Sequence, residues 1–182
     1  AVTGALERLR IDDAPAGARR WPHQWSGGML QRATIAAASA LGPALIVADE
    51  PTSALDADRA TATMEALRDN TSALLLVSHD ARLVAAHAER VAVCYGGRII
   101  ETGATADVFA HPRHPYTAGL LAALPRPGAG LPRPLPGGPP DLRQPEAGCG
   151  FCPRCDRADV TCANQLPPLA GGVACWRPLP GS

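Results

Sequence analysis

Residues 45 to 56 read LIVADEPTSALD, a short apolar run that ends in two adjacent carboxylates. A second apolar run, ALLLVS at residues 73 to 78, follows a stretch with a helical pattern. Continuous apolar strands between helices indicate an α/β fold in which a parallel sheet is covered on both faces. Functional groups of such sheets gather at the carboxyl ends of the strands, which here carry Asp49, Glu50 and His79.

Helices are expected on either side of these strands. Residues 28 to 41 (GMLQRATIAAASAL) predict an Ala-rich helix with Ser26 as its N-cap. A further helix is expected over residues 58 to 69, with Asp56 or Asp58 near its start, and another over residues 81 to 88. The alternation of strand and helix therefore extends through the first half of the chain.

A β-hairpin is expected next. Residues 91 to 95 (VAVCY) and 98 to 101 flank Gly96 and Gly97, a pair that suits a tight turn. Cys94 lies inside the first of these strands, and we expect it to be a small buried side chain.

Proline marks a change in organisation. Of the 19 prolines, 4 lie in residues 1 to 111 and 15 lie beyond them. Proline fixes φ and removes a backbone donor, so the second part is not expected to be mostly helix and sheet. We therefore predict a domain over residues 1–111, a C-terminal extension over 112–182, and within it a Pro/Gly linker over 125–145.

The charged residues exclude several kinds of function. All 17 basic residues are arginine, and they balance 17 acidic residues to a net charge of zero. The absence of lysine excludes a Schiff base, a lysine general base and a phosphate-loop lysine within these residues. A neutral chain lacks the basic surface that grips nucleic acid, so no nucleic-acid partner is expected. No apolar stretch is long enough to suggest a membrane span or a signal peptide.

Four motifs stand in a fixed order: WSGGMLQR at 25–32, LIVADEPTSALD at 45–56, LLLVSHD at 74–80 and GGRIIETG at 96–103. Each is weak alone, but the ordered set resembles the second half of an ATP-binding-cassette (ABC) nucleotide-binding domain. The resemblance implies the C-terminal half of a P-loop NTPase fold, with a parallel sheet and flanking helices. It also implies ATP and Mg²⁺ as the molecules bound.

The glycine-rich motif suits an anion site for a physical reason. Free N–H groups and the positive end of the dipole meet where Ser26, Gly27 and Gly28 open a helix. The resemblance assigns these residues and Gln31 to the signature that binds the γ-phosphate of ATP held by a partner subunit. The plain alternative is an ordinary N-cap and turn.

The acidic motif and the histidine complete the implied site. Asp49 would hold Mg²⁺, usually through water, and Glu50 would be the general base that positions the attacking water. The resemblance makes His79 the sensor of the γ-phosphate and makes Asp56 the D-loop aspartate that links two sites across a dimer. The alternatives are two surface acids, a solvated histidine, and for Asp56 the N-cap of the next helix.

Two elements of a complete cassette are not found in these residues. The phosphate loop G-x-x-x-x-G-K-[ST] needs a lysine, and only 25 residues precede Ser26 to hold that loop and a Q-loop glutamine. We therefore expect this chain alone not to bind ATP tightly or to hydrolyse it. The chain, which begins at Ala1, is expected to be a C-terminal fragment, a truncated gene product, or a stand-alone piece with another role.

The second part narrows the family. Residues 105–117 (TADVFAHPRHPYT) resemble the C-terminal extension of the ATPases of oligopeptide, dipeptide and nickel importers. The run GCGFCPRC at 148–155 and the later cysteines resemble the same subfamily's cysteine pattern. The pattern's own positions are Cys149, Cys155, Cys162 and Cys175; Cys152 departs from it.

Four thiolates in a short segment can ligate iron–sulfur or zinc. The subfamily's cysteine-rich tail implies a [4Fe–4S] cluster, and the spacings fit C-x₂-C zinc knuckles less well. Cys152 creates C-x₂-C-x₂-C, a ferredoxin-like spacing, so its part in the site stays open. The tail offers little hydrophobic core, so a metal centre would help it to fold.

The resemblance implies an ATPase subunit of an oligopeptide/dipeptide-type ABC importer, located at the cytoplasmic face of the membrane. Its partners would be a second ATPase subunit (the same or a different chain), membrane permease subunits and, indirectly, an extracytoplasmic substrate-binding protein. The rival interpretation is a non-catalytic metal-binding or docking module that donates only the signature to another ATPase. The transported substrate is not predicted, because specificity lies mainly in the partner proteins.

Overall fold

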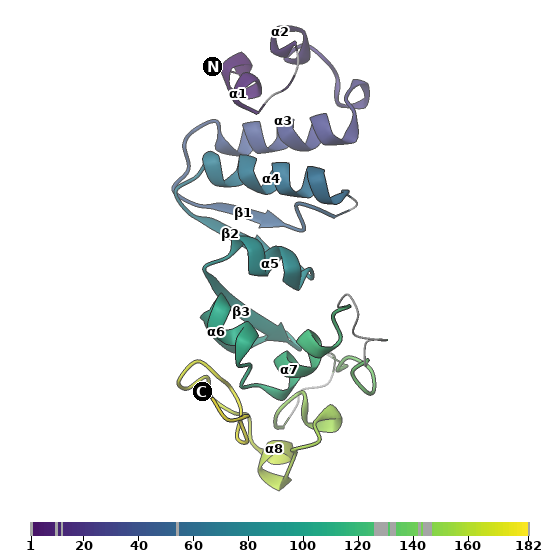
Figure 1. Ribbon diagram of the computed structural model, residues 1–182, viewed down its shortest axis with the longest axis vertical. Helices are drawn as coiled ribbons and strands as arrows, with labels where there is room; N and C mark the ends of the chain where they lie inside the picture. Colours follow the sequence, from purple (N-terminus) through teal and green to yellow (C-terminus); the bar gives the residue numbers. More distant parts are fainter. Residues whose placement is uncertain are drawn as a thin grey trace. The chain divides into compact units, whose positions relative to one another are not determined.

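The computed structural model describes residues 2–9, 11, 13–53, 55–125, 131, 134–141, 143 and 147–181. Contacts divide the chain into two compact units, Ala1–Asp80 and Ala81–Ser182 (Figure 1). These are called the first and the second unit below. The hairpin and its flanking helices thus belong with the C-terminal residues, whereas the division at residue 111 remains a prediction from the sequence pattern.

The first unit alternates helices and strands as predicted. Its elements are α1 (Val2–Arg8), α2 (Ala14–Gly17), the 3₁₀ turn η1 (Pro22–Gln24), α3 (Gly27–Ser39), β1 (Ile46–Asp49), α4 (Ala57–Asp69) and β2 (Leu74–Val77). The helix α3 packs against α4, and Figure 1 shows the two helices and then the strand pair as successive layers. Ile35, Met64 and Leu67 are among the buried side chains of this layer.

β1 and β2 pair in parallel, with Ile46 opposite Leu74 and Asp49 opposite Val77. The α/β class is therefore confirmed. Coverage of both sheet faces is not, because in the described part of the chain one face of this pair stays open. Side chains alternate between the faces of a strand, so Ile46 and Ala48 are buried while Val47 is 61% exposed and Val77 48% exposed.

The second unit is built around an antiparallel hairpin. Its elements are α5 (Ala81–His87), β3 (Arg90–Tyr95), β4 (Arg98–Ala104), α6 (Thr105–Ala110), α7 (Pro115–Ala122), the 3₁₀ turn η2 (Cys152–Arg154) and α8 (Val160–Asn164). The turn uses left-handed backbone at both Gly96 (φ 55°) and Gly97 (φ 74°), which glycine adopts without strain. The predicted hairpin is confirmed.

The core of the second unit joins the hairpin to the cysteine-rich segment. Val93, Tyr95 and Ile100 of the hairpin pack with Val108 and Phe151. The rings of Tyr95 and Phe151 meet edge to face with centroids 5.3 Å apart. Because Val93 and Tyr95 point into this core, the intervening Cys94 points away and is exposed, so the expectation that it is buried was wrong.

The end of the chain extends the same unit. The Thr102 amide donates to the Gly172 carbonyl, and the Ala174 amide donates to the Ile100 carbonyl, each at 2.8 Å. These bonds place residues 172 to 174 along the β4 edge of the hairpin. The C-terminal segment therefore covers an edge that would otherwise offer unpaired backbone groups.

The Pro/Gly linker predicted over residues 125–145 is described only in part. Residues 126–130, 132–133, 142 and 144–146 lie outside the described residues. Most of its described residues have no regular secondary structure, with bends at Leu131, Pro136 and Gly137, and Leu135 packs against the hairpin core. Across the described chain, no helix combines the length and the apolar character that a membrane crossing requires.

Candidate functional site

The signature region forms an open helix N-terminus. Ser26 has extended backbone and caps α3, because its Oγ accepts a hydrogen bond from the Met29 amide at 3.3 Å. Outside the chain neighbours and the helix's own backbone, no atom lies within 4 Å of the point where a Cβ would stand on Gly27 or Gly28. The start of this 13-residue helix is therefore uncrowded there, and the positive end of the helix dipole favours an anion.

Gln31 lies one turn further along α3 and links this helix to the acidic motif. Its side-chain amide donates to the Pro51 carbonyl, directly after Glu50. In this structure the Gln31 amide is thus engaged within the chain rather than turned to solvent. The bond ties the helix that opens with the signature to the loop that leaves β1.

Glu50 and His79 lie together at the carboxyl edge of the strand pair. One Glu50 carboxylate oxygen, Oε1, is 2.8 Å from both the backbone amide and the ring Nδ1 of His79. The Glu50 backbone is left-handed (φ 46°), an unusual conformation for a residue with a side chain, and its amide donates to the Val77 carbonyl. The structure therefore brings these two predicted site residues into direct contact, with the His79 ring largely exposed.

Asp49 and Asp56 flank this contact along the chain. Asp49 is the last residue of β1 and is exposed. Asp56 caps α4, since its Oδ1 accepts from the Arg59 amide at 3.0 Å, and its Oδ2 lies 3.3 Å from the Arg59 guanidinium. The alternative weighed for Asp56, a helix N-cap, is therefore realised.

The cysteine-rich segment forms a second candidate site, in the second unit. The Cys152 amide donates to the Cys149 carbonyl at 2.8 Å, and the Cys155 amide donates to the Cys152 carbonyl at 3.2 Å. Two successive turns therefore connect Cys149, Cys152 and Cys155, and Cys149 and Cys155 pack against the hairpin core.

The segment is held against α8, which carries Cys162. The Cys149 amide donates to the Cys162 carbonyl at 2.8 Å. A Cβ on Gly148 would collide with the carbonyl oxygens of Cys162 and Ala163, so only glycine allows this close approach. Packing therefore requires the glycine that begins the GCGFCPRC run.

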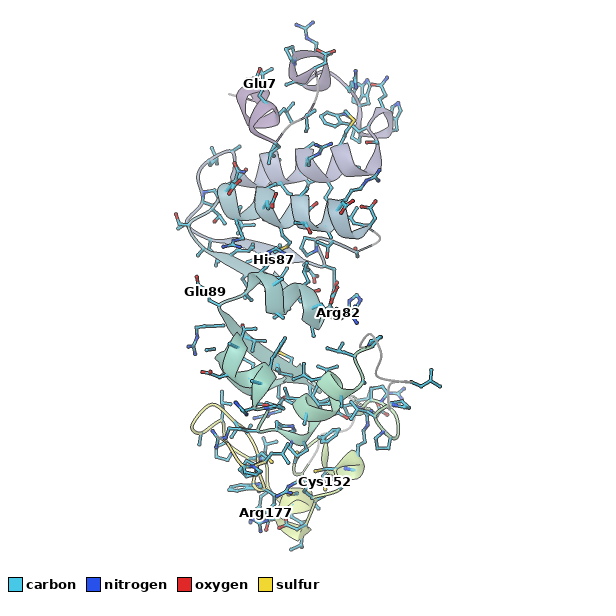
Figure 2. The ribbon with its side chains drawn as sticks, in the orientation of Figure 1. Glu7, Arg82, His87, Glu89, Cys152 and Arg177 are labelled. Atoms are coloured by element: carbon cyan, nitrogen blue, oxygen red, sulfur yellow. The ribbon has the colours of Figure 1, made fainter. Side chains whose placement is uncertain are left out.

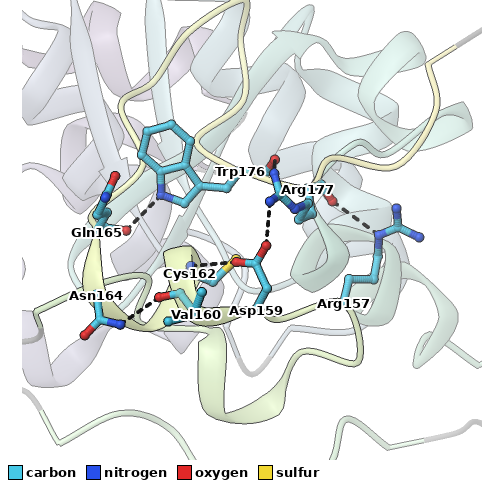
Figure 3. Close-up of polar contacts among 8 residues, drawn as sticks. All are labelled: Arg157, Asp159, Val160, Cys162, Asn164, Gln165, Trp176 and Arg177. Carbon is cyan, nitrogen blue, oxygen red and sulfur yellow. Dashed lines mark hydrogen bonds and ion pairs between the residues drawn. The ribbon is translucent and has the colours of Figure 1, made fainter.

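Trp176 and Arg177, which follow Cys175 in the sequence, bond to residues at the two ends of α8 (Figure 3). Asp159 caps α8 by accepting from the Cys162 amide at 3.0 Å and also pairs with Arg177 at 2.6 Å. The Trp176 indole donates to the Gln165 carbonyl at 2.9 Å. These contacts bring residues 175 to 177 to the helix that holds Cys162.

The thiols of this group influence one another. Burial raises the pKa of the Cys149, Cys152, Cys155 and Cys175 thiols, and the proximity of Cys162 adds to each rise. All six cysteines are free thiols. Among the residues that the structure describes, no three Cys, His, Asp or Glu side chains converge closely enough to hold a single metal ion.

One buried polar cluster escaped the sequence analysis. Glu101 on β4 is 2% exposed, and its carboxylate accepts from the amides of Arg113 (2.6 Å) and His114 (3.0 Å). The buried His114 ring accepts from the Tyr116 amide through Nδ1, and burial lowers the His114 pKa to about 4, although the Glu101 charge opposes the shift. The available signal was a lone acid after the apolar pair Ile99–Ile100.

Comparison with known proteins adds independent observations. Residues 1–53 match the family model described as ABC transporter, and residues 100–162 match the one described as oligopeptide/dipeptide transporter, C-terminal region. The dipeptide transport ATP-binding protein DppD of Bacillus subtilis (strain 168) is 40% identical over 173 residues, covering 91% of this chain and 51% of that protein.

A second relative is a D,D-dipeptide transport ATP-binding protein, DdpD, of Escherichia coli (strain K12), 42% identical over 186 residues and covering 95% of this chain and 56% of the relative. Among solved structures, cbiO1 from Clostridium perfringens, part of the ABC transporter complex cbiONQ, superimposes with a TM-score of 0.52 at 28% identity. That match covers 60% of this chain and 44% of the other. The chain spans about half the length of the curated relatives it matches.

Proposed function

Because the chain belongs to the ABC family of transporter ATPases and carries the oligopeptide/dipeptide transporter C-terminal region, we propose that it is the C-terminal part of an ATPase subunit of a peptide-type importer. The observation that carries this proposal is the Glu50–His79 contact at the carboxyl edge of β1 and β2. The same chain carries the signature motif at the start of α3, where Ser26 caps the helix.

The geometry supports a separate role for each group of residues at this site. The Glu50 Oε1 accepts from the backbone N–H of His79, and also from the ring when Nδ1 carries the proton, so Oε2 is the oxygen that would orient an attacking water. The uncrowded start of α3 at Gly27 and Gly28 suits the γ-phosphate of ATP bound to a partner subunit. Asp49 would hold Mg²⁺, which supplies positive charge for the phosphates when it is bound.

Hydrolysis is proposed for a complete cassette. The 182 residues contain no lysine, so the phosphate loop that grips the β- and γ-phosphates must come from other polypeptide. The exposed apolar face of β1 and β2 supports the same inference, because such faces are normally covered. Signature donation by a non-catalytic module is the second candidate, favoured by a signature helix that forms here without any phosphate loop.

The proposed partners follow from the family. A second ATPase subunit would supply the nucleotide that the signature contacts. Membrane permease subunits would receive the energy of hydrolysis at the cytoplasmic face, and a substrate-binding protein would deliver the peptide.

The cysteine group is proposed to hold a [4Fe–4S] cluster through Cys149, Cys155, Cys162 and Cys175. The support is the donor set, because these four cysteines are free thiols and the Cys149 amide bonds to the Cys162 carbonyl. Zinc, which four thiolates also bind, is the weaker alternative, since the spacings depart from C-x₂-C knuckles. When bound, the cluster would cross-link the tail and could exchange one electron.

The ATPase proposal is tested by Glu50→Gln in the complete subunit. We expect the hydrolysis rate to fall by about 10²–10⁴-fold, because the amide cannot accept the proton of the attacking water. ATP-driven dimerisation should persist. The control is Asp58→Asn, which changes an exposed acid of α4. Near-normal turnover by the Glu50 variant would reject the assignment of Glu50 as the general base.

A second experiment mixes the 182-residue chain alone with a fluorescent ATP analogue. Micromolar binding would reject the proposal that other polypeptide must supply the phosphate loop.

A further inference from the structure

The loop that leaves β1 begins with an unusual backbone conformation at Glu50. Its backbone is left-handed (φ 46°), and the next residue is Pro51. A side chain disfavours the left-handed region, and a following proline favours extended backbone instead. Such a conformation persists only where the surrounding structure holds it. The contacts around this loop therefore decide where the Glu50 carboxylate points.

Backbone hydrogen bonds from nearby residues supply part of this support. The Glu50 amide donates to the Val77 carbonyl of β2 at 2.9 Å, and the Ser53 amide donates to the Glu50 carbonyl at 3.1 Å. Neither bond reaches the peptide that follows Pro51.

Gln31 of α3 supplies a bond to that peptide. Its side-chain amide donates to the Pro51 carbonyl, and both residues are half-buried. Figure 1 shows α3 beginning on the side of the first unit at which β1 ends, and Figure 2 shows the same ends with their side chains. The helix that opens with the signature therefore supports the loop that carries Glu50.

The Gln31 bond acts on Glu50 through a short and stiff connection. The proline ring fixes the φ angle of Pro51, so the Pro51 carbonyl and the Glu50 backbone have few ways to move independently. The Glu50 side chain in turn meets the His79 amide and ring Nδ1 through Oε1, at 2.8 Å each. A displacement of about 1 Å at a reacting group can cost about 10²-fold in rate. Holding the Pro51 carbonyl therefore helps to aim the proposed general base.

We propose that Gln31 is a positioning residue for hydrolysis, whose side-chain N–H holds the Pro51 carbonyl and so fixes the backbone that aims Glu50. The inference rests on the proposed role of Glu50 as general base in the complete subunit. Gln31 then affects the rate of the chemical step, whereas a ligand of the nucleotide would affect the affinity for ATP.

The first experiment compares variants of the complete subunit. Gln31→Met keeps the length of the side chain but cannot donate, so we expect kcat to fall by about 10–10²-fold with KM for ATP unchanged. Gln31→Lys restores a donor of sufficient reach and should recover most of the rate. Thr34→Met, which places methionine at an exposed position of α3, is the control.

Two outcomes of this experiment would overturn the role of Gln31. One is a normal kcat in Gln31→Met, whether or not KM rises, and the other is a Gln31→Lys variant as slow as Gln31→Met. Glu50→Gln is measured beside them to separate this inference from the proposed function. Normal turnover in Glu50→Gln would reject the general base, whereas its loss together with normal turnover in Gln31→Met would reject Gln31 alone.

A second measurement uses the 182-residue chain and does not need activity. The His79 amide donates to the Glu50 carboxylate, and a bond to a charged acceptor moves an amide proton resonance downfield. In Gln31→Met this resonance should move upfield, toward its position in Glu50→Ala, and in Gln31→Lys it should return. The Ile46 amide, which bonds to the Ala73 carbonyl at 3.0 Å, reports whether the strands stay paired.

The two amide resonances together separate a local role from a general one. An unchanged His79 resonance in Gln31→Met would overturn the proposal, because Glu50 then keeps its place without the bond from α3. Equal movement of the Ile46 resonance would also overturn it, since Gln31 would then support the whole strand pair rather than this loop.

Discussion

The two units of this chain close their cores in different ways. In the first unit, helices cover one face of β1 and β2, while Val47, Leu75 and Val77 remain about half exposed or more on the other. In the second unit, Phe151 and the C-terminal segment return to the hairpin and cover its core and one edge. The residues proposed for the nucleotide site therefore lie on a layer that is open on one side, whereas the cysteine group lies in a unit whose own C-terminal residues cover its hairpin.

The Glu50–His79 site and the cysteine segment are therefore held in place in different ways. The Glu50–His79 contact depends on two short parallel strands and a left-handed backbone position. Residues held in that conformation persist only where the surrounding structure fixes them. The turns from Cys149 to Cys155 are instead fixed by Phe151, a buried aromatic residue within the same segment.

The largest effect is expected from Phe151→Ala in the second unit. Phe151 is 3% exposed and contacts the rings of Tyr95 and Tyr116. Its loss leaves a cavity between the hairpin and the cysteine turns, so we expect the free energy of unfolding to fall by about 3–5 kcal/mol. Urea unfolding measures this. The control is Val160→Ala, an exposed apolar residue of α8, and equal losses in both variants would mean that the hairpin does not fix the cysteine segment.

An intermediate effect is expected from acid in the second unit. The His114 pKa is lowered from 6.5 to about 4, mainly by burial. Between these values the unfolded chain binds more protons than the folded one, so stability falls as the pH falls through this window. Between pH 7.5 and 5 we expect a loss of about 2 kcal/mol from this residue.

The pH effect has a matched pair of variants. His114→Asn keeps an acceptor for the Tyr116 amide and removes the titration, so its stability should vary less between pH 7.5 and 5. His111→Asn changes an exposed histidine nearby and should retain the full dependence. The measurement is the urea midpoint of each variant at pH 7.5 and at pH 5. An equal shift of the midpoint in both variants would assign the effect to another group.

Much of this structure could be predicted from short segments of the sequence. The caps at Ser26 and Asp56, the parallel pairing of two apolar runs and the turn at Gly96–Gly97 each follow from short segments whose chemistry admits few conformations. The placement of Glu50 and His79 at one edge also followed, because parallel strands end together, whereas the hydrogen bond between them was not predicted.

What escaped prediction depends on contacts between distant residues. Glu101 is buried because two amides more than ten residues away satisfy its carboxylate, and no local pattern announces that arrangement. The exposure of Cys94 depends on which face of the hairpin receives Phe151. The open sheet face was missed because a continuous apolar run predicts two covered faces without saying which residues cover them.

The smallest effect is expected on that open face, and it tests the comparison of the two units most directly. Val47 and Ile46 are adjacent on β1 but point to opposite faces, 61% and 5% exposed. In this chain Val47→Ala should change the free energy of unfolding by no more than about 0.5 kcal/mol. Ile46→Ala should cost about 2–5 kcal/mol, because it empties a packed site.

Val47→Ala also distinguishes between two explanations of the open face. If other polypeptide covers it in the complete subunit, Val47→Ala should cost more there than in this chain, because the methyl groups become buried. If a second copy of this chain covers it, the cost would already appear here and would grow with protein concentration. A large and concentration-independent loss from Val47→Ala in this chain would contradict the open face, since only packing within the monomer produces it.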